Sequence, residues 1–255
     1  MALKYAGIEV QHREIELRNK PESMLMASPK GTVPVLIIGD VVLDQSIEIM
    51  RWALQKSDPD NWGGIDEDAA QIWIERNDVA FKTLLDQYKY SNRNPHLNQG
   101  EILDTAIALM LKPMNDALEA RQYLLGNQQS WIDVAIFPFV RQFSMVNRDW
   151  FDQLPFPALK RWLANYLQSE LFNAVMHKHP TWTVWPHLEL KSHFYFIEKG
   201  ADRMTSSNIH KSTKTLYGLV VAATARAAVY LFIVWGQKTD YPSHDVRRRF
   251  SDMTS

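Results

Sequence analysis

A proline at the head of a short apolar hairpin limits how this chain can fold. Two apolar runs, Val35–Ile38 and Val41–Leu43, flank Gly39-Asp40, a two-residue turn typical of an antiparallel hairpin. Pro34 has no backbone N–H to give to a sheet ladder, so it belongs at a strand start, at an edge or in a bulge. The Val33–Pro34 bond, in a tight and functional position, is also a place where a cis peptide is used. The residues by themselves leave both interpretations open.

The lack of cysteine excludes several chemistries. The sequence has 255 residues and no Cys, so within it there is no disulfide, no thiolate metal site and no cysteine nucleophile. Hydrophobic residues make up 46% and charged residues 22%, which predicts a sizeable packed core. A net charge of -1 gives no electrostatic basis for binding nucleic acid. The first residues lack the apolar run of a signal peptide, which indicates a cytoplasmic protein.

The helix predicted after the hairpin begins at a site suited to an anion. Ser46 is expected to cap this helix, whose free backbone N–H groups and positive dipole end favour a carboxylate. Gln45 and the Ser46 hydroxyl add side-chain hydrogen bonds at the same point. With Pro34 in the cis form, the backbone N–H and C=O of Val33 would turn toward a peptide-like ligand. Lys20 would supply a positive charge for a second carboxylate, so the pattern predicts a small anionic peptide such as glutathione.

From about residue 68 to residue 179 the pattern is helical throughout. Pro113 is expected to kink or split one of the helices. The segment 130–143 opens with Ser130 and Asp133, a pair typical of a capping box, and is apolar nearly all round, like a central bundle helix. We therefore predict an α/β part over residues 1–57, an all-helical part over 66–186, and a tail of uncertain structure over 187–255.

The stretch "LRNKPESMLMASPKGTVPVLIIGDVVLDQSIEI" resembles the glutathione-binding half of glutathione S-transferases, closest to their omega-like and bacterial members. It matches the family's order of NKP, P-x-G-x-VPVL and [ED]-[SQ]-S-I, and "SWIDVAIFPFVRQF" resembles the capping-box helix of the family's C-terminal domain. The resemblance covers residues 1–183 and implies a thioredoxin-like module followed by an all-helical bundle. It also implies glutathione as co-substrate, a small hydrophobic electrophile as second substrate, and no metal.

The resemblance assigns a role to each predicted binding residue. Val33 would pair with the cysteinyl backbone of glutathione, beside a cis Pro34. Gln45 and Ser46 would hold the γ-glutamyl carboxylate, and Lys20 would lie at the glycyl end. Without the family pattern, an edge-strand proline and a plain helix cap are the simpler interpretations of these residues.

One departure from the family concerns the start of the sheet. The family begins with a strand and a loop that carries the catalytic Cys, Ser or Tyr, whereas this sequence begins within the following helix, at "MALKYAGI". We therefore expect a truncated module that lacks its first strand, has a gap in its four-stranded sheet and holds no catalytic residue. A start upstream of Met1 and a degenerate form both fit, with the former favoured. We therefore expect weak catalysis. Robust turnover would mean that another residue, such as Tyr5 or Ser28, activates the glutathione thiol.

The tail contains a long apolar segment, 216–235, with one charge, Arg226, near its centre. Its length and flanking basic residues suit a membrane span. However, inserting the arginine costs about 2.5–3.5 kcal/mol, which nearly cancels the roughly 3–5 kcal/mol gained from the apolar residues. A buried helix, or two β-rich runs packed on the bundle, is slightly favoured. Membrane contact through 216–235 and a homodimer both stay open.

Two functions from different classes fit these patterns. The favoured one is a cytoplasmic glutathione S-transferase that, in a full-length form, transfers glutathione to electrophiles or reduces mixed disulfides. The alternative is a non-catalytic binding or regulatory protein with the same fold, tethered to a membrane by its tail. Phe81, Tyr88 and Arg141 would line the electrophile site, although aromatic residues at helix spacing are more often core. His177 and His179 have a metal-like spacing, but such a pair seldom binds a metal alone, so no metal site is predicted.

Overall fold

The computed structural model describes residues 1–183 and 229–233. Contacts divide the chain into two compact units, which we call the helical unit and the sheet unit. The helical unit contains Met1–Glu9 and Gln45–His177, and the sheet unit contains Val10–Asp44 and the described residues of Lys178–Ser255. Helices α1 (Ala2–Tyr5) and α3 (Ser46–Lys56), which come from the predicted α/β part, are therefore grouped with the helical unit.

The sheet unit is built around a four-stranded sheet with the order β1-β4-β2-β3. β2 and β3 form the predicted antiparallel hairpin, in which Ile38 pairs with Val41 across the turn. Gly39 has a φ of 58°, a left-handed conformation that glycine adopts without a steric penalty. The elements of the unit are β1 (Gln11–Glu14), α2 (Glu22–Ala27), β2 (Val35–Ile38), β3 (Val41–Leu43) and β4 (Val229–Ile233).

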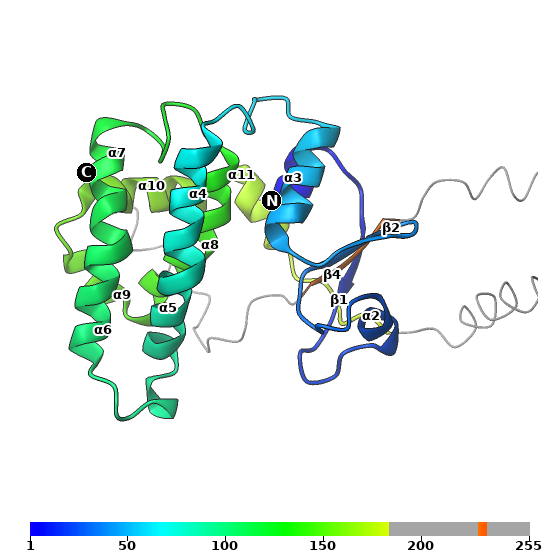
Figure 1. Ribbon diagram of the computed structural model, residues 1–255, viewed down its shortest axis with the longest axis horizontal. Coiled ribbons are helices and arrows are strands. Elements are labelled where there is room, and N and C mark those ends of the chain that lie inside the picture. Colours follow the sequence, from blue (N-terminus) through cyan, green and yellow to red (C-terminus); the bar gives the residue numbers. More distant parts are fainter. Residues whose placement is uncertain (184–228, 234–255) are drawn as a thin grey trace, which may run out of the picture. The chain divides into compact units, whose positions relative to one another are not determined.

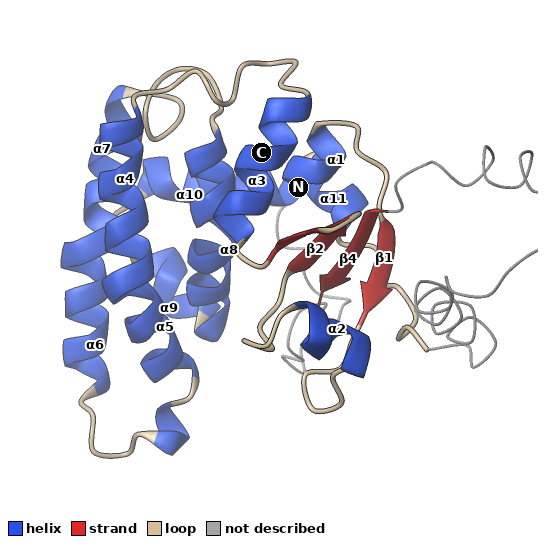
Figure 2. Ribbon diagram, turned by 45° about the vertical axis from the view of Figure 1, so that its right-hand side comes forward, coloured by secondary structure: helices blue, strands red, loops and turns tan. Residues whose placement is uncertain are grey.

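The gap expected in the sheet is occupied by a strand from far along the chain. β4 runs parallel to β1 and antiparallel to β2, so it lies inside the sheet and not at an edge. Orange β4 accordingly lies beside the blue strands in Figure 1, and Figure 2 shows β1, β4 and β2 as neighbours. Of the apolar segment 216–235, residues 216–228 and 234–235 lie outside the described residues. The described part is a strand of the sheet and not a run packed on the bundle.

The helical unit is a bundle of helices whose apolar faces meet in one core. Two long helical runs each contain a π-helical segment, and a shorter set of helices completes the bundle. None of the described helices is both long enough and apolar enough to cross a membrane. Besides α1 and α3, the elements are α4 (Glu67–Glu75), η1 (Arg76–Phe81), α5 (Lys82–Lys89), η2 (Ser91–Arg93), α6 (Gln99–Ala106), η3 (Ile107–Leu111), α7 (Lys112–Ala120), α8 (Trp131–Val146), α9 (Arg148–Gln153), α10 (Pro157–Gln168) and α11 (Glu170–Val175).

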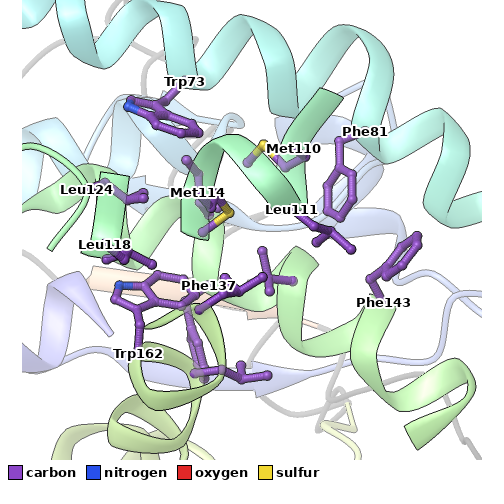
Figure 3. Packing of buried hydrophobic residues seen from close by; sticks show 14 of the residues in the cluster. Trp73, Phe81, Met110, Leu111, Met114, Leu118, Leu124, Phe137, Phe143 and Trp162 are labelled. Carbon is purple, nitrogen blue, oxygen red and sulfur yellow. The ribbon is translucent and has the colours of Figure 1, made fainter. Parts of the chain in front are cut away.

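Pro113 produces a change of helix type at the predicted position. It is the second residue of α7, directly after the π-helical segment η3. Proline lacks an N–H and its ring crowds the carbonyl of the preceding turn, so a wider turn before it relieves both problems. The side chains of this segment remain in the core, where Met110 and Leu111 are fully buried near Phe81 (Figure 3).

A buried carboxylate joins three parts of the helical unit. Asp133 in the first turn of α8 accepts hydrogen bonds from Ser130 N and Oγ (3.3 and 2.7 Å), which confirms the predicted capping box. It also accepts from Leu124 N and from Trp162 Nε1, each at 3.0 Å. Burial raises the pKa of the Asp133 carboxyl, and these donors oppose the rise. The Ser130–Asp133 pair therefore has a structural role, as predicted.

Candidate functional site

Two of the predicted binding residues lie in the loop that leads into β2. The Val33–Pro34 peptide bond is cis, as predicted. Both residues are half-buried, and the next residue, Val35, is fully buried and begins β2. Pro34 thus stands just before the strand, where its missing N–H removes no ladder hydrogen bond.

Asp44, which follows the hairpin, accepts hydrogen bonds from two side chains of the segment before β2. Lys30 Nζ lies 2.8 Å from Asp44 Oδ1, and the buried Ser28 donates its hydroxyl to Asp44 Oδ2 at 2.8 Å. These two hydrogen bonds, that from Lys30 first, lower the pKa of the Asp44 carboxyl from its ordinary value. Sequence reasoning missed this contact because the partners are 14 and 16 residues apart, and no local pattern marks such a pair.

Lys20 covers the same loop. A Cβ placed on Gly31 would lie 3.6 Å from Lys20 Nζ and 3.2 Å from Leu25 Cδ2. Gly31 also has a φ of 61°, so both its backbone conformation and its surroundings favour glycine. Lys20 is half-buried, and among the described carboxylates none forms an ion pair with it. Its ammonium group is therefore available to an anionic ligand.

In the helical unit, Gln45 and Ser46 lie at the start of α3. Gln45 is the N-cap, with extended backbone angles of φ -124° and ψ 132°, and Ser46 is the first helical residue. The prediction that Ser46 caps the helix is wrong by one position, because the chain is still extended at Gln45. The Gln45 side chain makes no capping hydrogen bond, and both side chains are exposed to solvent.

This helix start has the properties of a carboxylate site. The first N–H groups of an α-helix have no intrahelical acceptor, and the first such bond in α3 runs from Ile49 N to the Gln45 carbonyl at 3.0 Å. Glu48 in the same turn already places a negative charge near this dipole end. Selection of a ligand therefore depends on the side chains of Gln45 and Ser46 as well as on the dipole.

The five predicted residues thus form two groups. Lys20, Val33 and Pro34 come together at one loop of the sheet unit. Gln45 and Ser46 share the first turn of α3 in the helical unit.

The predicted electrophile-lining residues have mostly structural positions. Phe81 and Tyr88 are 0% and 6% exposed, and their rings lie 5.2 and 5.1 Å from that of Phe143, centroid to centroid. These two residues are core, so their predicted role as lining residues is wrong. Arg141 is half-buried with its Cζ 5.3 Å from the Phe172 ring centroid, and burial lowers the pKa of its guanidinium.

The two hydroxyls considered as thiol activators are engaged elsewhere. The Tyr5 hydroxyl donates to Asp58 Oδ1 at 2.8 Å and accepts from Asp60 N at 2.7 Å, while its ring stacks on Trp62. Burial raises the pKa of Tyr5 to about 12, with smaller contributions from the Asp58 and Asp60 carboxylates, against the opposing hydrogen bond from Asp60 N. Ser28 likewise gives its hydroxyl proton to a carboxylate. Neither hydroxyl has a proton left to donate to a thiolate.

Two histidine rings of the sheet unit lie against each other. His179 stacks on His12 with ring centroids 3.8 Å apart. Within residues 1–183 and 229–233, no three or more His, Asp or Glu side chains are grouped so as to hold a metal ion.

Two family models match the chain over most of the described residues. The N-terminal domain of glutathione S-transferases matches residues 1–61, and the C-terminal domain of the same family matches residues 73–165. Together the matches cover more than half of the chain. The chain belongs to the glutathione S-transferase family. No curated protein matches it.

Solved structures of other glutathione S-transferases share the fold. Glutathione transferase F2 from Populus trichocarpa has a TM-score of 0.56 and 15% identity, covering 69% of this chain and 89% of that chain. The glutathione S-transferase from Xylella fastidiosa has a TM-score of 0.55 and 18% identity, covering 69% and 89%. That from Rhodospirillum rubrum F11 has a TM-score of 0.54 and 16% identity, covering 72% and 86%. The predicted fold class, a thioredoxin-like module with a small sheet followed by a helical domain, is confirmed.

Proposed function

We propose that this glutathione S-transferase binds glutathione as co-substrate, and that its transfer to a small hydrophobic electrophile needs a thiol-activating group other than the Tyr5 and Ser28 hydroxyls, which are engaged elsewhere. The observation that carries the proposal is the match of both domains of the family in the family's order along the chain. The fold supports glutathione-dependent transfer in general, and the residue roles below are our proposal for this chain. A mixed disulfide is the other substrate class that we propose to test.

The start of α3 is proposed to bind the γ-glutamyl end of glutathione. Ser46 and Gln45 present an exposed hydroxyl and an exposed amide beside N–H groups that lack intrahelical acceptors. A carboxylate accepts hydrogen bonds from all three kinds of donor and is favoured by the positive end of the helix dipole. The Gln45 side chain is not held by a capping bond through its carbonyl oxygen, so its amide can turn its N–H₂ donors toward the carboxylate.

The loop before β2 is proposed to bind the rest of the peptide. The backbone N–H and C=O of Val33 would pair with the cysteinyl residue, as one extended segment pairs with another. Lys20 would attract the glycyl carboxylate through an ammonium group that no described carboxylate neutralises. Gly31 supports this role because a Cβ at that position would contact the Lys20 side chain.

The Ser46→Ala variant tests the assignment of the carboxylate site. Losing a hydrogen bond to a charged group costs about 1.5–3 kcal/mol, so glutathione affinity should fall by roughly 10- to 150-fold in a calorimetric titration. Ser57→Ala is the matched control, because Ser57 is an exposed serine at the other end of the same helix. Equal affinities of the two variants would show that the Ser46 hydroxyl does not bind the γ-glutamyl carboxylate.

Activity can be measured without interference from protein thiols. The sequence contains no cysteine, so every thiol consumed in an assay with glutathione and an aromatic electrophile comes from glutathione. Any conjugate, detected by mass spectrometry, should form slowly because neither Tyr5 nor Ser28 activates the thiol, and its rate should fall in the Ser46→Ala variant more than in Ser57→Ala. No conjugate above the uncatalysed rate, together with retained binding, would favour the non-catalytic binding protein.

A further inference from the structure

β1 and β2 do not pair with each other. A strand-wide position between them, which we call the β1–β2 slot, holds β4. On one side, Gln11–Glu14 pair in parallel with residues 230–233, and on the other side Val35–Ile38 pair in antiparallel fashion with residues 229–232. The occupant of the slot is therefore hydrogen-bonded along both of its edges.

Without an occupant, both neighbouring strands would lose their main partner. Among the described residues, β1 would keep only the isolated bridge from Glu14 to Thr181, and β2 would keep only β3. A two-stranded hairpin is at best marginally stable in water, and an edge with unpaired N–H and C=O groups recruits other strands. Among the residues whose side chains are described, Ile15, Met24 and Val35 form a buried apolar cluster in this unit. The N–H and C=O groups of β1 and β2 that face the slot therefore favour the binding of a strand between them.

The occupant has the chemistry of a strand ligand. Its sequence, VYLFI, consists of aliphatic, β-branched and aromatic residues with no proline, glycine or charge, the composition that strands favour. Residues 184–228 separate it from the other described residues, so it comes from outside the segment that builds β1 and β2. In strand addition, main-chain hydrogen bonds provide the affinity for such a segment.

We propose that the β1–β2 slot is a binding site for an extended apolar peptide, parallel to β1 and antiparallel to β2. Its resident occupant is the chain's own Val229–Ile233, and a free peptide with these five residues competes for the same place. A proline at the third position is excluded, because Leu231 is paired with both His12 and Leu36.

An engineered disulfide in the full chain tests the register and the source of the occupant. Ile37 and Tyr230 are directly opposite each other, and the Cα separations of opposite antiparallel residues, about 4.5–5.5 Å, fall within the range of disulfides. Ile37→Cys with Tyr230→Cys should oxidise to a cross-linked monomer, without background because the native sequence has no cysteine. Ile37→Cys with Leu231→Cys is the control, because neighbouring strand residues face opposite sides. Cross-linking equal to the control, or cross-linking only between two chains, would overturn the proposal.

A peptide-binding experiment tests whether a free peptide can take the place of Val229–Ile233 in the slot. A fluorescent VYLFI peptide, flanked by lysines for solubility, should bind the full-length Leu231→Pro variant at least about tenfold more tightly than the unaltered chain, whose tethered strand competes at a high effective concentration. A peptide with proline in its third position is the matched control and should not bind. Equal binding to both chains, or equal binding of both peptides, would overturn the proposal. The helical circular dichroism of Leu231→Pro shows whether the helical unit remains folded, and the disulfide test stands if it does not.

Discussion

The helical unit and the sheet unit obtain their stability from different sources. In the helical unit, successive helices bury a continuous core of large side chains, and one buried carboxylate links α8, α10 and the segment before α8. In the sheet unit an interior strand is supplied from far along the chain and is hydrogen-bonded on both sides, to β1 and to β2. The stability of the sheet unit therefore depends on hydrogen bonds to β4, a strand that is distant in sequence from β1 and β2.

The largest effect is expected from Asp133→Ala in the helical unit. The change leaves Leu124 N and Trp162 Nε1 buried without an acceptor, so the free energy of unfolding should fall by at least about 3 kcal/mol. Denaturant unfolding followed by helical circular dichroism measures this loss. Asp104→Ala, which removes an exposed carboxylate from α6, should cost less than about 0.5 kcal/mol. Similar losses for both variants would contradict the structural role of Asp133.

Met24→Ala is the corresponding change in the sheet unit. Met24 is fully buried in the cluster with Ile15 and Val35, and its truncation should cost about 2–5 kcal/mol. Hydrogen exchange should quicken in β2 and β4, while the helices keep their protection. Met26→Ala in the same helix is the control, since Met26 is 78% exposed. Faster exchange in both units alike would show that the two units do not differ as proposed.

Gly31→Ala should have a smaller effect that combines stability and binding. A left-handed φ costs an L-residue about 1–2 kcal/mol, and the added Cβ would lie tightly against Leu25 Cδ2, at 3.2 Å, and in ordinary contact with Lys20 Nζ, at 3.6 Å. Gly39→Ala is a close control, because its φ is 58° but nothing lies within 4 Å of the added Cβ. Glutathione affinity should therefore fall more in Gly31→Ala than in Gly39→Ala. Equal losses would argue against Lys20 as a ligand for the glycyl carboxylate.

The smallest effect concerns pH and the hydrogen bonds to Asp44. Because the pKa of Asp44 in the folded protein lies below its ordinary value of 3.8, its contribution to stability is complete above that value and is lost as the pH falls through the lowered pKa. A carboxyl-carbon NMR titration should show this pKa, and Lys30→Ala should raise it. The same pKa in both proteins would mean that Lys30 does not hold the loop before β2.

Elements with a strong local signal were predictable from sequence. The hairpin of β2 and β3, the capping box of α8 and the helix that follows Gln45 each rest on turn chemistry, caps or apolar periodicity within a few residues. The order of motifs from Lys20 to Ser46 was also sufficient to indicate the glutathione S-transferase family, which the domain matches then established. The exact cap was missed by one residue because Ser and Gln both fit a helix start, and backbone angles alone distinguish them.

Contacts between distant segments were decided only by the tertiary structure. The apolar run that contains Val229–Ile233 fits a membrane span, a buried helix or β-rich runs, with the last two only slightly favoured, because hydrophobicity alone does not specify a partner. Its position between β1 and β2 depends on the unpaired N–H and C=O groups of those two strands. The two strands come to lie on either side of one position only in the folded sheet unit. Likewise, the bonds from Ser28 and Lys30 to Asp44 form because the hairpin returns the chain to the loop before β2. Sequence determines local conformation through short-range sterics and hydrogen bonding, whereas these distant pairings form between backbone and side-chain groups that only the folded chain brings within reach of one another.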